Sequence, residues 1–229
     1  MAENILIQAP GFSHRYCSLL IAHCSLLIAH CSLFIDMTIA LTEHQPAQTL
    51  VKPGITWEQF CAIRNSFADI PGIRASYCQG TLEIVTISKL HETIKCILAA
   101  LLVEYFLRLD IDVFPSGSYT QSVRGVVEYE ADLSYAIATE KEYPDLCVEI
   151  VVSSGGTDKL KKYRQVGVKE VWIWKRSKIA VYVLQDGDYT QSDRSVLFPD
   201  LDLAVLETCV QLRSLTQAVK QFRQSLDRG

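Results

Sequence analysis

Apolar residues recur along the chain at two spacings, one typical of helices and one typical of strands. Between residues 91 and 109 a broad apolar stripe repeats every three or four positions, which predicts an amphipathic helix. A shorter helix is expected to begin after Thr56, which can cap it together with Gln59, and to run to Phe67. The same spacing over residues 211–226 predicts a closing helix.

Alternating apolar and polar positions predict strands. Residues 73–77 and 81–87 flank Gln79 and Gly80, which is typical of a β-hairpin, and residues 113–123 predict a strand pair around Gly117. Further strands are expected over residues 132–138, 146–152, 168–175 and 179–184.

A crossover is expected between the second and third of these further strands. Residues 153–157 contain two glycines that end the strand, and Asp158 can cap a helix that reaches Val166 before Gly167 stops it. Strand, helix and strand in this order indicate an α/β (α+β) fold, in which a mixed central sheet is flanked by helices.

The N-terminal part carries a seven-residue repeat over residues 16–36, in which nearly every position is copied. A coiled coil constrains only two positions per heptad, so duplication of the coding DNA explains the copying better. The segment is interpreted as an extension outside the fold, with a membrane anchor and a peptide packed on the domain as alternatives. The expected organisation is an extension over 1–36, an entry segment over 37–55 and one domain over 56–229.

Composition narrows the classes of function. The chain has 229 residues, of which 49% are hydrophobic and 21% charged, so one domain with a substantial core is expected. A net charge of −4 argues against a protein that coats nucleic acid through bulk positive charge, so any such contact is expected to be local. The eight cysteines form no CxxC pair, which favours reduced thiols in a cytoplasmic protein over zinc binding or disulfides.

Charge is distributed unevenly. Residues 128–149 hold seven acids and one base, Lys141, whereas residues 159–178 hold eight bases and one acid, Glu170. Carboxylates from adjacent strands can bind a divalent cation, and neighbouring bases can neutralise charge developing on a phosphate. The alternative is that these charges lie in solvated loops.

Two carboxylates interrupt apolar runs, Asp132 in ADLSYAI and Glu149 in LCVEIVV. A buried carboxylate must be paired, neutralised or bound to metal, so neighbouring strands would place both within reach of one ion. The alternative is that one of them faces solvent from an edge strand. Lys159 opens the next helix and can reach the same end of the sheet. A basic helix face, or simply solvated residues, is expected at Lys161, Lys162 and Arg164.

Three segments, EADLSYAI, YPDLCVEIVVSSGGTDKLKKY and GVKEVWIW, resemble the Uma-two family of restriction-endonuclease-like proteins within the PD-(D/E)XK nuclease superfamily. The resemblance extends from about Thr56 to the C-terminus. It implies Mg²⁺ dependence, with Mn²⁺ as a substitute, and cleavage of DNA, with Asp132 and Glu149 as metal ligands. Lys159 and Tyr163 match family positions. Glu92, beside His91, is the candidate for an additional carboxylate from the first long helix.

The chain departs from the superfamily motif at two positions. Ala131 stands where proline is usual, and Val151 stands where the motif lysine follows the acid, so Lys159 must supply the lysine from the helix. The sequence thus predicts a metal-dependent DNA endonuclease in which the carbonyl of Ile150 also contacts the ion. Lys161, Lys162 and Arg164 are expected to contact phosphates. The alternative is a catalytically inactive module that keeps the fold and binds DNA or protein. A homodimer is expected, and no membrane partner.

Overall fold

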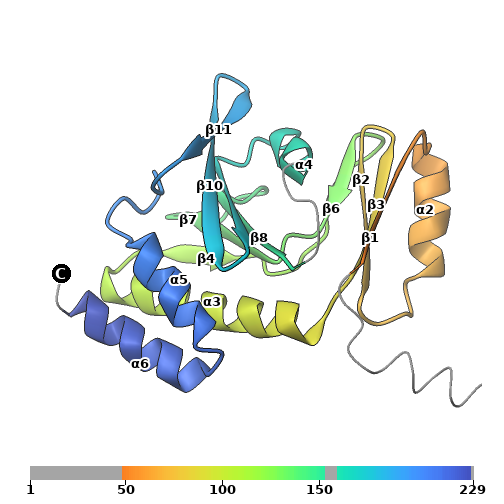
Figure 1. Cartoon of the computed structure of the whole chain (residues 1–229). Helices are drawn as coiled ribbons and strands as arrows, with labels where there is room; N and C mark the ends of the chain where they lie inside the picture. Colours follow the sequence, from red (N-terminus) through yellow and green to blue (C-terminus); the bar gives the residue numbers. More distant parts are fainter. Residues whose placement is uncertain (1–47, 153–158, 228–229) are drawn as a thin grey trace, which may run out of the picture. The chain divides into compact units, whose positions relative to one another are not determined.

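Two β-sheets and five helices make up the part of the chain that the computed structural model describes, residues 48–152 and 159–227 (Figure 1). The predicted mixed fold is therefore confirmed. The repeat over 16–36 and the predicted cap Asp158 lie outside the described residues. None of the helices within the described ranges is long and apolar enough to cross a membrane.

The five-stranded sheet is antiparallel throughout and has the order β1-β3-β2-β6-β5. Its strands are β1 (Thr49–Pro53), β2 (Ile73–Cys78), β3 (Thr81–Thr86), β5 (Gln121–Val123) and β6 (Val127–Tyr129). The predicted hairpin is β2 and β3, joined through Gln79 and Gly80, which both have positive φ angles. β1 pairs with β3 along its whole length, so the fold starts within the expected entry segment and not near Thr56.

The six-stranded sheet has the order β11-β10-β9-β8-β7-β4. Its strands are β4 (Val113–Pro115), β7 (Leu133–Ile137), β8 (Leu146–Val151), β9 (Glu170–Lys175), β10 (Lys178–Gln185) and β11 (Asp188–Ser192). β8 and β9 are parallel and the other pairs are antiparallel, so this sheet is mixed. The chain passes from β8 through α4 (Leu160–Arg164) to β9, as expected for a crossover.

The predicted strand pair over residues 113–123 is wrong. β4 pairs with β7 and β5 pairs with β6, so the two halves belong to different sheets. The physical reason is packing, because Val113 contacts the apolar core beside α3, whereas Val123 contacts the core beside α4. Alternation in the sequence predicts that a segment is a strand but does not determine its partner.

Helices cover the sheets from different sides (Figure 1). α3 (Lys89–Arg108), α5 (Leu203–Gln211) and α6 (Leu215–Leu226) contact one another and enclose the larger core with the six-stranded sheet. α2 (Trp57–Ser66) packs on β2, and α4 contacts β2, β6 and β11. The predicted closing helix is α6, which begins at Leu215 because Ser214 caps it and Arg213 takes a left-handed conformation, whereas α5 was not predicted.

The capping box predicted at Thr56 is present. The Thr56 side chain accepts a hydrogen bond from the Gln59 N–H at 3.2 Å, and the Gln59 side chain accepts one from the Thr56 N–H at 2.9 Å. We expect Thr56→Ala to lower the free energy of unfolding by about 1 kcal/mol, because an N–H at the start of α2 loses its acceptor. Urea denaturation measures the change. Thr56→Ser keeps the acceptor, so equal losses in both variants would contradict this explanation.

Candidate active site

Asp132 and Glu149 come together where two interior strands of the six-stranded sheet, β7 and β8, lie side by side. Their strands are neighbours, and the register pairs Leu133 of β7 with Val148 of β8. One further step along both strands places Asp132 opposite Glu149. Their relative exposures are only 4% and 2%. Both carboxylates are therefore buried, which rules out the alternative in which one faces solvent from an edge strand.

Asp132 is held by donors from three different elements. Its Oδ1 accepts a hydrogen bond from Arg74 Nη1 of β2 at 2.6 Å. Its Oδ2 lies 2.9 Å from His91 Nε2 of α3 and accepts the Ile150 N–H of β8 at 2.7 Å. Burial alone would raise the pKa of Asp132, but the hydrogen bonds from His91 and Ile150 and the charge of Arg74 lower it to about 2. The carboxylate is therefore ionised at neutral pH.

Glu149 is held by two residues of the helical segment that follows β8. Lys159 Nζ donates to Glu149 Oε2 at 2.7 Å, and the Tyr163 hydroxyl donates to Oε1. Burial opposes the charged form of Lys159, but the charges of Glu149 and Glu83 outweigh this and raise its pKa. Burial and the neighbouring Glu149 charge raise the pKa of Tyr163 well above its ordinary value. Lys159 is thus a fixed cation and Tyr163 a neutral donor.

A third carboxylate approaches from the five-stranded sheet. Glu83 Oε2 of β3 accepts hydrogen bonds from Ser76 Oγ at 3.2 Å and from Lys162 Nζ at 3.1 Å. Burial raises the pKa of Glu83, but the charges of Lys162 and Lys159 lower it overall. Lys162 is 5% exposed, so it contributes to this network and not to an exposed basic face. Sequence reasoning missed Glu83 and Arg74, since each occupies an ordinary alternating position in the hairpin.

These groups line a common cavity of about 40 Å³. It is bounded by Asp132 and Glu149 from the central strands, by Arg74 and Glu83 from the hairpin, and by Lys159 and Lys162 from the segment after β8. The space is sufficient for about one water molecule or small cation. Buried charges of both signs in one small cavity are typical of a functional site.

A family model described as "Uma2: Putative restriction endonuclease" matches residues 57–218, which is more than half of the chain. The chain belongs to the Uma2 family. The resemblance in the three segments around Asp132, Glu149 and Lys159 is thereby confirmed at the level of the family.

One solved structure similar to this Uma2 protein is described as a putative nuclease belonging to DUF820 from Anabaena variabilis ATCC 29413. The two are 16% identical with a TM-score of 0.41, and the match covers 73% of this chain and 99% of the other. The comparison with curated proteins found no match.

The remaining candidates of this Uma2 protein lie outside the cavity. Glu92 is half exposed, binds Lys95 at 2.6 Å and lies 3.1 Å from His91 Nδ1, so it contacts Asp132 only through His91. Lys161 is exposed, and Arg164 forms an ion pair with Asp188 at 3.3 Å. The predicted basic face is therefore divided, with Lys162 inside and the other two bases outside.

The donor chemistry of the cavity suits a partly hydrated divalent cation. Across residues 48–152 and 159–227, no three His, Cys, Asp or Glu side chains are arranged to hold a metal ion. Asp132 accepts three hydrogen bonds and Glu149 two, whereas two ionised carboxylates offer roughly eight lone-pair positions. Mg²⁺ commonly binds one or two carboxylates and completes its shell with water and substrate phosphate. The two carboxylates therefore fit such an ion.

Proposed function

We propose that this Uma2 protein is a metal-dependent endonuclease that hydrolyses phosphodiester bonds in DNA. The observation that carries the proposal is the position of Asp132 opposite Glu149, with the Lys159 ammonium 2.7 Å from Glu149 Oε2. Two carboxylates and a fixed cation in one cavity supply the charges that metal-assisted hydrolysis of a phosphodiester requires. The family's description supports the same activity.

Asp132 and Glu149 would hold Mg²⁺, or Mn²⁺ in its place. When bound, the ion lowers the pKa of a coordinated water and polarises the phosphate. The Ile150 N–H donates to Asp132 Oδ2 at 2.7 Å. Contact between the Ile150 carbonyl and the ion stays a prediction.

The protein's own groups then position the reactants. Tyr163 fixes the orientation of Glu149 through its hydroxyl, and Arg74 does the same for Asp132. Lys159 keeps its positive charge and so can orient the attacking water or stabilise charge on the phosphate. Lys162 adds a second ammonium on the cavity wall. Lys161 and Arg164, which lie outside the cavity, would contact flanking phosphates.

The proposal is tested by calorimetric titration of Mg²⁺ into the protein. We expect one site in the wild type, with affinity lowered more than roughly a hundredfold in Asp132→Asn and in Glu149→Gln, because each removes a charged ligand. Glu104→Gln is the matched control, since Glu104 pairs with Arg223 on α6, away from the cavity. Unchanged binding in either site variant would refute the shared metal site.

A catalytically inactive nucleic-acid-binding module is the second candidate. One observation favours it, namely that both oxygens of Asp132 and both oxygens of Glu149 already accept hydrogen bonds within the protein. Absence of Mg²⁺ binding in the titration, with and without DNA, would establish this candidate over the endonuclease. The homodimer and the cytoplasmic location stay predictions.

A further inference from the structure

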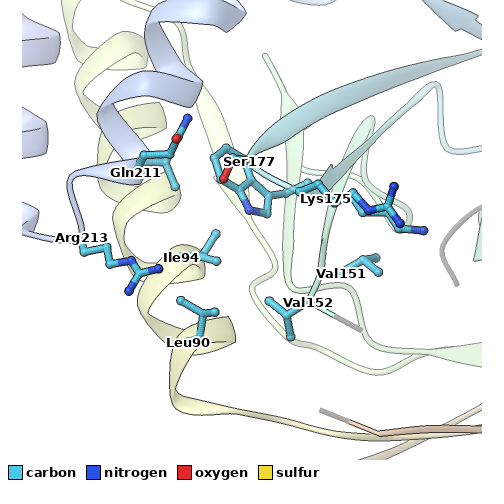
Figure 2. Close-up of a pocket in the computed structure, with 11 residues that line it drawn as sticks. Leu90, Ile94, Val151, Val152, Lys175, Ser177, Gln211 and Arg213 are labelled. Carbon is cyan, nitrogen blue, oxygen red and sulfur yellow. The ribbon is translucent and has the colours of Figure 1, made fainter. Parts of the chain in front are cut away.

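A second and larger cavity, of about 610 Å³, opens beside the candidate active site. It lies between the first turns of α3, the ends of β8 and β9 and the connection from α5 to α6 (Figure 2). We call it the arginine pocket and define it by Leu90, Val152, Lys175, Arg176, Ser177 and Arg213. Its volume lies within the range of about 300–1,000 Å³ that is usual for ligand sites.

The lining of the arginine pocket is strongly positive. Lys175, Arg176 and Arg213 all line it, and no Asp or Glu within residues 48–152 and 159–227 does, although the chain as a whole has a net charge of −4. Among the described residues, none forms an ion pair with Arg176 or Arg213. A cavity lined by one sign of charge attracts the opposite charge, so the pocket is suited to an anion. Arginine is the residue best matched to phosphate.

Local backbone preference does not explain the two arginines. Arg176 and Ser177 form the two-residue turn between β9 and β10, with φ angles of +51° and +63°. Such turns favour Asn-Gly, because both residues have positive φ. Arg213 follows α5 with a φ of +56°, at a position where glycine is usual. Both arginines thus occupy unfavourable conformations on the wall of one cavity, and such strain is common at ligand sites.

Most of the remaining lining is apolar. Leu90, which is 41% exposed, and Ile94 come from α3, whereas Val151 and Val152 come from the end of β8 (Figure 2). Ser177 and Gln211 add a hydroxyl and an amide. An apolar wall beside arginines and a few polar groups fits the sugar and base of a nucleotide together with its phosphates.

The arginine pocket is close to the catalytic carboxylates along the chain. Val152 follows Glu149 by three residues, which is about 10 Å along an extended strand. Leu90 directly precedes His91, whose ring contacts Asp132. A nucleic-acid strand that places one phosphate at Lys159 can therefore reach the pocket within a few nucleotides, at roughly 3.4 Å of rise for each.

We infer that the arginine pocket seats an unpaired nucleotide of the substrate strand, with Arg176 and Arg213 on its phosphates. This inference rests on the proposed function for the identity of the ligand. It adds a binding site to the carboxylates and Lys159. The arginine pocket would bind the strand and take no part in its cleavage.

The test is binding of a fluorescent single-stranded DNA of about 12 nucleotides, measured by anisotropy in EDTA so that cleavage plays no part. The variant is Arg176→Asn with Arg213→Asn, since asparagine removes the charge and tolerates positive φ. The matched control is Arg108→Gln with Arg223→Gln, which removes the same charge near the far end of α3. We expect binding at least roughly tenfold weaker in the pocket variant and a salt slope smaller by about 1.4, with the control near wild type.

The outcomes separate the pocket from the proposed activity. Equal weakening in pocket variant and control, or no weakening in either, would overturn the pocket assignment even if the wild type cleaves DNA. Selective weakening in the pocket variant supports the assignment even if no cleavage is found with Mg²⁺. Competition by deoxyadenosine monophosphate as strong as that by the unlabelled oligonucleotide would instead identify a free nucleotide as the ligand and overturn the strand assignment.

Discussion

Glu149→Gln is expected to reduce Mg²⁺-dependent cleavage of DNA by roughly a thousandfold or more, because it removes the charge of one of the two proposed carboxylate ligands. Glutamine has the same size and keeps an oxygen that can accept from Lys159 or Tyr163, so the fold is retained. The measurement is conversion of supercoiled plasmid to nicked and linear forms over time, with EDTA as the metal-free reference.

Glu104→Gln serves as the control for this substitution, since Glu104 is bound to Arg223 by two hydrogen bonds of 2.6 Å and does not line the cavity. Its cleavage rate should match the wild type. Loss of activity in both variants would indicate a contaminating nuclease or general damage. Full activity of Glu149→Gln would exclude Glu149 from the reaction.

The core of the candidate site could be predicted because charge in an apolar strand is physically conspicuous. Asp132 and Glu149 stand in runs that bury nearly every other side chain, and such carboxylates need partners. Lys159 could be placed near them because the helical segment begins a few residues after β8. These inferences depend only on local sequence and on the adjacency of β7 and β8.

The rest of the site depends on packing between sheets, which local sequence does not encode. Arg74 and Glu83 alternate with apolar neighbours in a hairpin, as solvent-facing residues usually do. They reach the cavity only because the five-stranded sheet brings the hairpin against β7 and α4. The strand partners of residues 113–123 were mispredicted for the same reason, since the choice between two cores is made in three dimensions.

Glu170 shows why burial of a carboxylate does not by itself identify a catalytic residue. It stands in the apolar strand EVWIWK and has 0% exposure, so it satisfies the pattern that singled out Glu149. Its partners are different, however. The donors are the Trp172 indole, the Ser195 hydroxyl and the backbone N–H groups of Val196 and Leu197. No Lys or Arg is among them, and the group anchors the segment after β11.

The same substitution should therefore act mainly on stability at Glu170 and mainly on activity at Glu149. Glu170→Gln is expected to lower the free energy of unfolding by roughly 3 kcal/mol or more. The amide NH₂ replaces one carboxylate oxygen, so the two donors that faced this oxygen lose their acceptor. For a domain of this size the midpoint of thermal unfolding should fall by about 6–12 °C. Urea denaturation of both variants provides the comparison. Glu149→Gln should lower the free energy of unfolding by less, about 1–2 kcal/mol, because the Tyr163 hydroxyl can rotate to accept from the amide and the charges of Glu83 and Asp132 still act on Lys159. If Glu170→Gln proved as stable as the wild type, the Glu170 network would not be an anchor of the fold. The type of donor, neutral or cationic, would then not distinguish a structural buried carboxylate from a functional one.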